Sequence, residues 1–225
     1  MENNPKEENI KVLYEDNHLI AVYKPAGTLV QGDKSGDISM IEEVKMYIKN
    51  KYNKPGNVFL GLIHRLDRNV DGIVLFAKTS KGASRLSEQF REHSVEKIYH
   101  AWVSGIVKEK NKTLINFLRH NENQNYTEVF DEEVRDSDRA ELSYEFIESD
   151  GDFSLLKIKL KTGRQHQIRS QLSHIGHPIV GDTKYGSTIK SGDQRIFLTE
   201  TSLSFNTATT DERKTVTIEI PKKTW

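Results

Sequence analysis

A short polar segment at residues 64–68, HRLDR, places a carboxylate among cationic side chains. Asp67 follows an apolar stretch that is typical of a strand, with Arg65 and Arg68 close to it in sequence. A carboxylate at the end of a rigid strand can be held ionised and aimed by nearby arginines, as a nucleophile or a general base requires. A lone aspartate at a strand end more commonly caps a turn through its side chain.

Two other chemistries compete for the same segment. His64, Asp67 and Asp71 could ligate a metal ion, although no second cluster at ligand spacing supports this, and His166, His174 and His177 are more simply explained as backbone-binding or partner-facing. Asp67 and Asp71 could also form the acid–base pair of a glycosidase, but their spacing in sequence does not set the separation of their carboxylates. Both are minority interpretations.

A second polar cluster, TGRQHQIR, occupies residues 162–169. Gly163 permits a sharp turn, and Arg164 would then begin a helix at the end of a lysine-rich strand. An arginine in that position could pair bidentately with a carboxylate or a phosphate. A merely solvated basic helix start is less attractive, because the helix dipole disfavours positive charge at that end.

The elements that must position these clusters are mostly strands. The run at 73–77 is continuously apolar, as in a strand buried on both faces, and residues 111–150 contain short alternating strands with irregular connections. With no regular βαβ rhythm, the pattern predicts an α+β fold on a mixed, largely antiparallel sheet with flanking helices. The other expected strands are 12–14, 19–23, 58–63, 97–107, 153–161, 196–198 and 215–220. The expected helices are 40–51, after a capping box at Ser39 and Glu42, 80–90, and 165–175 with Ile168 and Leu172 inward.

Length and composition limit what the protein can be. With 225 residues, 35% hydrophobic and 29% charged, the chain can bury a core and is not of the disordered class. No apolar run approaches the roughly 20 residues that span a membrane, and the polar N-terminus resembles no targeting signal. The absence of cysteine excludes disulfides and thiolate chemistry and fits a cytoplasmic location. We expect a disordered tail at residues 1–9 and one folded domain over residues 10–225.

The net charge of zero argues weakly against a nucleic-acid partner, but the charges are unevenly distributed. Residues 122–152 hold twelve acidic and two basic side chains, whereas residues 153–181 hold five basic and no acidic ones. One face could therefore be strongly positive. Equally, the two segments could be ordinary solvated strands that pair with each other.

Four motifs, in this order, resemble those of the RluA-type branch of the RNA pseudouridine synthases, which modify ribosomal and transfer RNA. The similarity spans roughly residues 10–220, and motifs of this length are far more specific than a short pattern. A separate N-terminal S4-type RNA-binding domain, present in many members, is expected to be absent, because the motifs begin almost at once. The motifs are KPAG at 24–27, HRLDR with GIVLFAKT at 64–68 and 72–79, KIYHAWVSG at 97–105, and TGRQHQIR with HIGHPIVGDTKYG at 162–169 and 174–186.

The resemblance implies a role for each matched residue. Asp67 would act at the ribose of a target uridine, so that the N1–C1′ bond breaks and the uracil turns and rejoins through C5. Tyr99 would pack against the uracil and help move its proton, and Arg164 would pair with Asp67. Arg65 would fill the space left by the flipped-out nucleotide, which lowers the cost of flipping, and Ile168 would form an apolar wall.

The resemblance also implies the partner and the needs of the reaction. His64, Lys97 and Arg169 lie in the same motifs and are expected to contact RNA. The partner would be ribosomal or transfer RNA, as a compact stem-loop, bound by a monomer that contacts no membrane. A single carboxylate would need neither metal nor cofactor, because the uracil leaves as a stabilised anion and is recaptured while water is kept out.

The chain departs from the family pattern at three places. Val70-Asp71 stands where Thr-Ser is common, Gln165 where threonine is usual, and Thr199-Glu200 where His-Ala is common. The carboxylate of Asp71 could disturb Asp67 unless it points away or finds a cation. It motivates the alternative hypothesis of a catalytically inactive RNA-binding or RNA-folding factor on the same fold. A metal-dependent hydrolase is a distant third.

Overall fold

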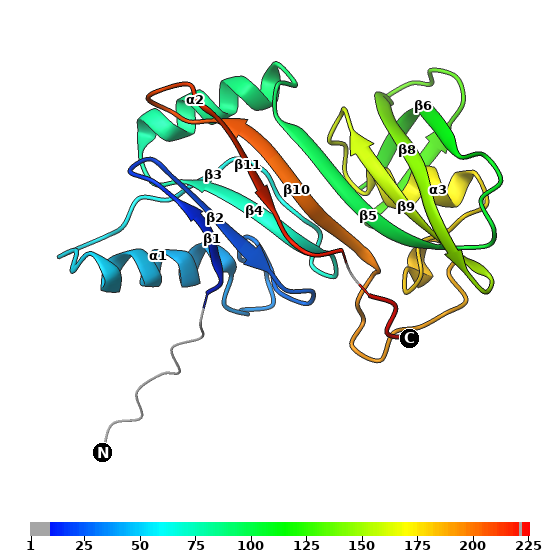
Figure 1. The fold of residues 1–225 in the computed structure, drawn as a ribbon, viewed down its shortest axis with the longest axis horizontal. Coiled ribbons are helices and arrows are strands. Elements are labelled where there is room, and N and C mark those ends of the chain that lie inside the picture. The colour runs from blue at the N-terminus through cyan, green and yellow to red at the C-terminus, as the bar shows by residue number, and fades with distance from the viewer. Residues whose placement is uncertain (1–9, 221) are drawn as a thin grey trace.

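The computed structural model describes residues 10–220 and 222–225, and in them eleven strands form one mixed sheet accompanied by three α-helices (Figure 1). The α+β class is confirmed, whereas the predicted disorder of residues 1–9 lies outside the described residues. The elements are β1 (Val12–Glu15), β2 (Leu19–Lys24), α1 (Met40–Lys51), β3 (Gly61–Leu62), β4 (Asp71–Ala77), α2 (Ser80–Arg91), β5 (Glu96–Ser104), β6 (Asn111–Asn121), β7 (Tyr126–Phe130), β8 (Asp138–Asp150), β9 (Phe153–Leu160), α3 (Gln167–His174), the 3-10 helix η1 (Thr183–Tyr185), β10 (Leu198–Asn206) and β11 (Arg213–Thr217).

The sheet is interrupted beside β4, at the point where the polar segment 64–68 crosses it. The strand order is β1-β2-β4-β10-β5-β9-β8-β6-β7, with β11 beside β10 and β3 beside β4. Among the described strands only β4 and β10 pair in parallel. Two residue pairs near the start of both strands join them, Asp71 with Thr199 and Gly72 with Glu200. The last two residues of β4 pair with β3 instead. The middle of that edge of β4 therefore pairs with neither strand.

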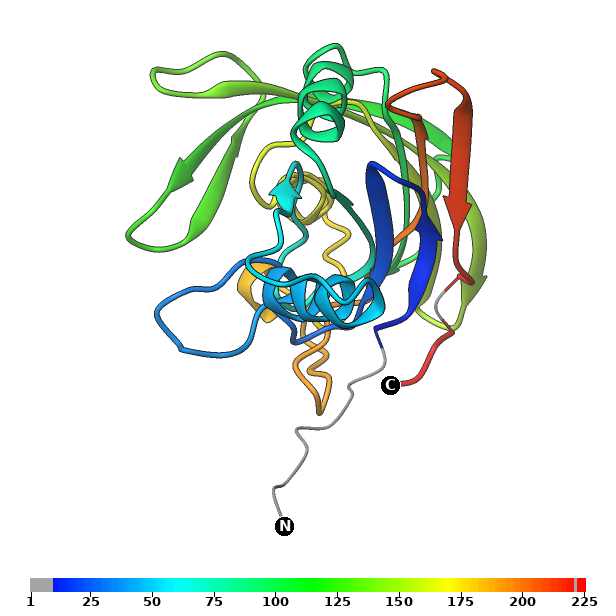
Figure 2. The ribbon, with the colours of Figure 1, turned by 90° about the vertical axis from the view of Figure 1, so that its left-hand side faces the viewer.

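β4 is buried along its whole length because both of its faces are covered. One face joins the main core with side chains from α1 and α3, and the other joins a second core with α2 and β11. In Figure 2 the sheet curves around the region where α1 lies. The apolar run at 73–77 is thus confirmed as a strand buried on both sides.

The helices begin where their sequences supply caps. Ser39 and Glu42 form the predicted capping box of α1, and the Thr79 hydroxyl accepts a hydrogen bond from the Gly82 amide at the start of α2. α3 begins at Gln167, two residues later than predicted, because His166 has a left-handed backbone with φ of +54°. In the part of the chain that the structure describes, no helix is both long and apolar enough to cross a membrane.

Three strand predictions are wrong in length or position, and one of them is 196–198, where β10 instead runs from Leu198 to Asn206. Residues 58–63 are predicted as one strand, but only Gly61 and Leu62 find a pairing position on β4. Residues 111–150 are predicted as short strands, whereas β6 and β8 have 11 and 13 residues and pair over eight of them. Their polar, exposed faces conceal the strand pattern in the sequence.

The two lysines of β9, and Lys161 directly after it, are paired with acidic side chains of the neighbouring strands. Lys157 lies 3.9 Å from Glu145 and Lys161 lies 2.9 Å from Glu141, both on β8, and Lys159 bonds to Glu96 on β5. The acidic and basic segments therefore pair with each other, and this face is not the strongly positive surface that the charge distribution allowed.

Candidate active site

His64 fills the interruption in the sheet. Its Nε2 accepts the hydrogen bond of the Leu75 amide at 3.0 Å, a β4 donor that neither β3 nor β10 reaches. The imidazole stacks on Phe90 with 5.1 Å between ring centroids, and burial lowers the pKa of His64 to about 3, so it acts as a neutral acceptor. Only its other ring nitrogen is left for the RNA contact expected of it.

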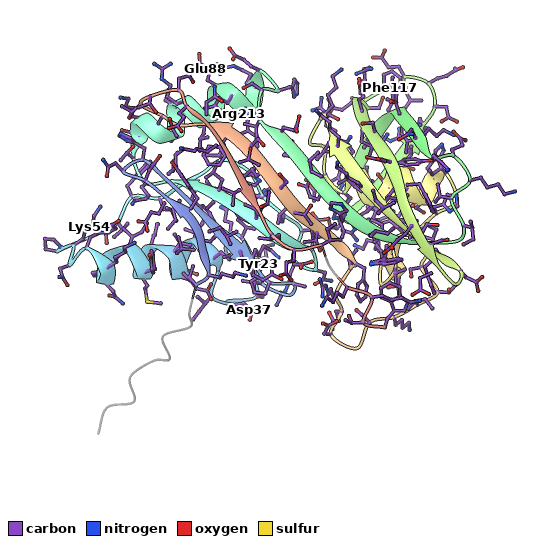
Figure 3. All side chains as sticks on the ribbon, viewed as in Figure 1. Tyr23, Asp37, Lys54, Glu88, Phe117 and Arg213 are labelled. Carbon is purple, nitrogen blue, oxygen red and sulfur yellow. The ribbon has the colours of Figure 1, made fainter. Side chains whose placement is uncertain are left out.

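Lys24 fixes the loop that carries Asp67. The fully buried ammonium at the end of β2 donates to the carbonyl oxygens of Pro25, Arg68 and Val70, at 3.1, 2.9 and 2.6 Å. Burial lowers the pKa of Lys24 to about 8, against the opposing charges of nearby carboxylates. The Arg68 guanidinium contacts Asp37, which is labelled in Figure 3 in the loop before α1, at 2.5 Å. Lys24 of the KPAG motif thus fixes the main chain on the C-terminal side of Asp67 through these hydrogen bonds.

Asp67 is held by Arg169 on α3. The Nη1 of Arg169 donates to Asp67 Oδ2 at 2.8 Å, while its Nε and Nη2 donate to the two oxygens of Asp182 at 2.7 and 3.0 Å. Arg169 and Asp182 are buried, whereas 31% of the Asp67 side chain is exposed. Burial alone would lower the pKa of Arg169, but the bonds to Asp182 and the charge of Asp67 raise it overall, so the guanidinium stays charged.

The expectation that Arg164 pairs with Asp67 is wrong. Arg164 precedes α3 and turns the other way, with Nη2 3.4 Å from Asp138 and Nε 3.3 Å from the Arg139 carbonyl oxygen. The helix starts too late for Arg164 to point inward, and Arg169 takes the pairing position. Arg169 directs three guanidinium donors to Asp67 and Asp182 and also lines the pocket, so the RNA contact expected of it stays a prediction.

Helical spacing contained a signal for Arg169. It lies next to Ile168 and three residues before Leu172, the two predicted inward positions of α3, and both are buried in the structure. A buried arginine needs carboxylate partners. Asp182, the partner of Arg169, lies inside the motif at 174–186, but the motif alone did not indicate which residue it would pair with.

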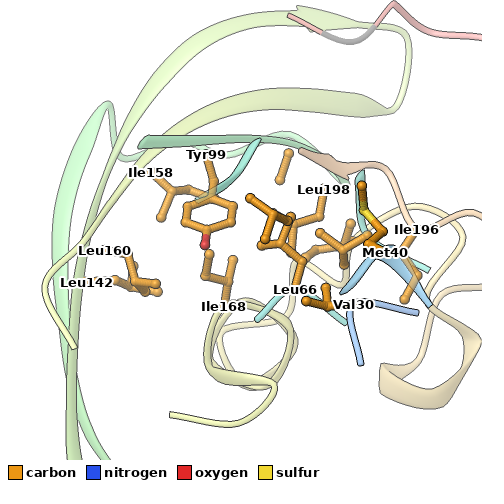
Figure 4. Packing of buried hydrophobic residues seen from close by; sticks show 14 of the residues in the cluster. Val30, Met40, Leu66, Tyr99, Leu142, Ile158, Leu160, Ile168, Ile196 and Leu198 are labelled. Carbon is orange, nitrogen blue, oxygen red and sulfur yellow. The ribbon is translucent and has the colours of Figure 1, made fainter. Parts of the chain in front are cut away.

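Tyr99 and Ile168 form the wall of a pocket beside Asp67. Tyr99 projects from β5 and Ile168 from α3, and Figure 4 shows the tyrosine ring directed towards Ile168 within the main core. The pocket has a volume of about 380 Å³, in the range of small-molecule sites. Its lining includes Arg65, Leu66, Asp67, Lys97, Tyr99, Arg164, His166, Ile168, Arg169 and Leu198.

A wider cavity of about 990 Å³ meets the pocket at Asp67. Arg65 and Arg164 line both spaces, and Arg68 and Lys184 line the wider one. Arg65 is exposed and forms no ion pair within the described residues. Arg65 thus lies where the two cavities meet and Ile168 lies in the lining of the pocket, while the roles expected of both residues stay predictions.

Lys97 lies inside the pocket rather than on an outer surface. Its ammonium is 5.7 Å from the centroid of the Phe90 ring. Burial lowers the pKa of Lys97, and the charge of Glu200 on β10 opposes that shift. The RNA contact expected of Lys97 would thus be with whatever enters the pocket.

His166 is a neighbour of Asp67 that sequence reasoning did not assign. Its Nε2 is 3.7 Å from Asp67 Oδ2, and its Nδ1 is 2.9 Å from the Tyr185 hydroxyl. Burial lowers the pKa of His166 to about 4 despite the charge of Asp67. The ring is therefore neutral at pH 7, and Arg169 is the charged partner of the carboxylate.

Asp71 does not act on Asp67. Its carboxylate is buried between β4 and β10, where it accepts hydrogen bonds from Tyr23 at 3.0 Å, Thr199 at 2.8 Å and Arg195 at 2.9 Å. Arg195 is therefore the cation that balances Asp71. The hypothesis of a catalytically inactive protein rested on a disturbance of Asp67 by Asp71, and it loses that support. With Asp71 and His64 Nε2 engaged elsewhere, Asp67 has neither a second acid nor a ligand set beside it, and the described residues contain no group of three potential metal ligands.

Comparison with known proteins identifies the family of this chain. Residues 18–174 match the protein family described as RNA pseudouridylate synthase. That match covers more than half of the chain, and this protein therefore belongs to that family.

Individual relatives carry similar names. A ribosomal large subunit pseudouridine synthase C of Vibrio cholerae is 32% identical over 200 residues, which are 86% of this chain and 60% of that protein. A tRNA pseudouridine synthase C of Haemophilus ducreyi is 33% identical over 228 residues, 92% of this chain and 89% of that protein. The chain thus spans about 60% of the length of the Vibrio relative. The structure of human RNA pseudouridylate synthase domain containing 4 superposes with a TM-score of 0.78 over 94% of this chain and 89% of that one, at 20% identity, and shares the fold.

Proposed function

We propose that this protein isomerises uridine in structured RNA to pseudouridine, with Asp67 as the reacting carboxylate. One observation carries the proposal: the carboxylate that Arg169 holds stands where the 380 Å³ pocket meets the wider, cation-lined cavity. The family and the names of the relatives support this class of reaction. Residues 10–225 would act as one catalytic unit.

The pocket suits a uracil ring removed from its stack. The ring would lie between Tyr99 and Ile168, and Arg65 at the mouth would take the space that the nucleotide leaves in the RNA. Asp67, fixed by a buried guanidinium, would act at the ribose so that the N1–C1′ bond breaks, and the uracil would rejoin through C5. Because atoms move only within one nucleotide, no co-substrate is required, and the apolar walls keep water from the detached base.

The RNA backbone would follow the wider cavity. Arg65, Arg68, Arg164 and Lys184 line it together with the buried Arg169, and none of the lysines of β9 does. A local cluster of this kind lets a protein without net charge bind phosphates. We expect a stem-loop of ribosomal or transfer RNA as the target, and a monomer that acts in the cytoplasm.

Mapping of pseudouridine tests the proposal. Total RNA from cells that lack the gene is incubated with the purified protein and mapped by carbodiimide-dependent stops of reverse transcription. We expect one or a few new stops, each at a uridine that is modified in cells carrying the gene. If no new stop appears, whereas RNA from cells with the gene shows such stops, the proposal is wrong.

A further inference from the structure

Glu200 on β10 is a buried carboxylate that the proposed reaction has not used. It stands opposite Tyr99 of β5 in the antiparallel register, and Tyr99 donates its hydroxyl hydrogen to Glu200 Oε2 at 3.0 Å. The Glu200 side chain is completely buried, and its Oε1 has no hydrogen-bond partner among the described residues. A half-satisfied buried carboxyl group is costly, and such costs collect at functional sites.

The backbone makes room for this carboxyl group. Gly72 of β4 lies directly against the Glu200 main chain, with φ of +139°, and a Cβ on it would come within 2.6 Å of the Glu200 amide nitrogen and 2.8 Å of its Cβ. The two strands therefore approach this closely at Glu200 only because residue 72 has no side chain. This close approach fixes the backbone from which the Glu200 carboxyl group reaches the Tyr99 hydroxyl.

The charged groups facing Glu200 come from few elements. Lys97 and Tyr99 of β5 act on it directly, and Asp67 and the neutral His64 face them from the loop after β3, while β4 contributes Gly72. Burial raises the pKa of Glu200, and the charge of Lys97 and the bond from Tyr99 only partly oppose this. Burial, together with the charge of Glu200, also raises the pKa of Tyr99, so the phenol does not ionise alone. A proton can leave it only towards an acceptor.

We propose, building on the proposed function, that Glu200 is the positioning residue and proton acceptor of Tyr99 during the last step of isomerisation. After the uracil has rejoined through C5, that carbon carries both C1′ and a hydrogen. Tyr99 takes this proton as its own hydroxyl proton passes to Glu200. The electron pair of the C5–H bond forms the C5=C6 double bond, and the π electron pair of the N1=C6 bond moves onto N1. N1 then takes a proton from water. Glu200 then returns its proton to Tyr99, which releases a proton to water. The nucleotide has therefore lost one proton from C5 and gained one at N1.

The test follows hydrogen loss from C5. A transcript of the mapped target, labelled with tritium at C5 of uridine, is reacted in single turnover with excess protein, and tritium release is followed between pH 6 and 9. Release by the wild type should accelerate as pH rises and Glu200 ionises. Glu200→Gln keeps the shape but accepts no proton, so release should slow on the order of 100-fold, the usual contribution of a general base. The pH-dependent rise should vanish, with the RNA dissociation constant unchanged.

Three further variants decide whether the effect passes through Tyr99. Glu200→Asp should recover part of the rate together with the rise with pH. In a Tyr99→Phe background, Glu200→Gln should add little, because the group it serves is absent. Asp71→Asn is the control, because it removes another buried carboxylate from the place where β4 and β10 pair. It should leave the shape of the tritium-release rate against pH unchanged.

Wild-type rates and pH profile in Glu200→Gln would overturn the relay. So would an equal slowing of the Tyr99→Phe protein by the same substitution. Either result leaves the proposed function standing, provided that the wild type releases tritium and Asp67→Asn does not. If the wild type forms no pseudouridine at all, the proposed function itself fails.

Discussion

At the scale of single residues, one guanidinium connects two carboxylates of different character. Asp182 is buried and takes two hydrogen bonds from Arg169, so it fixes the plane of the guanidinium. Asp67 is partly open and takes the remaining bond. The arrangement presents Asp67 in one orientation to the pocket while leaving its other oxygen free of Arg169.

Substitution of the two arginines should separate orientation from RNA binding. Arg169→Met should reduce single-turnover conversion at saturating RNA by at least 100-fold and destabilise the protein by about 3–5 kcal/mol, because Asp182 remains buried and unpaired. Arg164→Met should weaken RNA binding and leave the rate at saturation nearly unchanged. Titration of conversion against protein concentration measures both, with denaturant unfolding for stability. The opposite pattern would restore Arg164 as the partner of Asp67.

The motifs predicted which residues meet but not which arginine pairs with Asp67. Asp67, Tyr99 and Ile168 could be assigned because each type has a distinct task. Arg164 and Arg169 lie five residues apart in one motif, and the choice depends on where α3 begins. The left-handed His166 sets that start, and although histidine adopts this conformation more often than most residues do, the sequence does not show which histidine will adopt it.

At the scale of elements, the site depends on the edge of β4 that β10 and β3 both pair with. Its start pairs with β10, its end with β3, and the segment 64–68 crosses between them. The Lys24 clamp and the His64 acceptor satisfy main-chain groups that a regular sheet would have paired.

Gly72 is the element-scale position most sensitive to change. Gly72→Ala places a methyl group within 2.6 Å of the β10 main chain at a φ of +139°, and should cost about 2–4 kcal/mol. Gly192→Ala is the matched control, because a Cβ there meets nothing within 4 Å, and should change stability by less than about 0.5 kcal/mol. Urea unfolding measures both. Equal, small effects would mean that β4 and β10 separate more easily than the structure indicates.

The buried elements were predictable and the exposed ones were not. β4 reads as an unbroken apolar run, and β9 as a clean alternation, because burial dictates their residues. β6 and β8 carry many polar residues whose partners lie on neighbouring strands, as Glu141 and Glu145 do. Such pairing becomes visible only when the strands are placed together.

At the scale of the whole molecule, stability should carry a pH signature of Glu200. Burial raises the pKa of Glu200 from 4.5 to about 8, so the folded protein holds a proton that the unfolded chain loses. This contribution is complete below pH 4.5 and is lost as pH rises towards 8. His64 and His166, with lowered pKa values, act in the opposite direction below pH 6.5. Only a comparison with Glu200→Gln isolates the carboxyl group.

The difference in unfolding free energy between wild type and Glu200→Gln is therefore the quantity to measure. Between pH 5 and 8 the wild type should lose roughly 1–3 kcal/mol relative to the variant. Denaturant melts at four or five pH values give this difference directly. A constant gap would mean that Glu200 keeps the same charge in the folded and unfolded chains.

The distribution of cations predicts where RNA binds. Arg65→Gln and Lys184→Gln, at the wider cavity, should weaken RNA binding and reduce the slope of log affinity against log salt by up to about one for each lost phosphate contact. Lys157→Gln and Lys159→Gln should change neither, because those lysines are paired with glutamates of adjacent strands. Filter binding at several salt concentrations distinguishes the two surfaces. An equal loss from the β9 lysines would move the RNA to the outer face of the sheet.

The central claim, that Asp67 performs the isomerisation, is tested most directly with Asp67→Asn on the mapped target RNA. The amide keeps the size of the side chain and a hydrogen-bond acceptor for Arg169, so folding and RNA binding should stay close to the wild type. Conversion of the target uridine, measured by carbodiimide mapping after a reaction long enough for the wild type to finish, should be undetectable. Full conversion by Asp67→Asn would contradict the account.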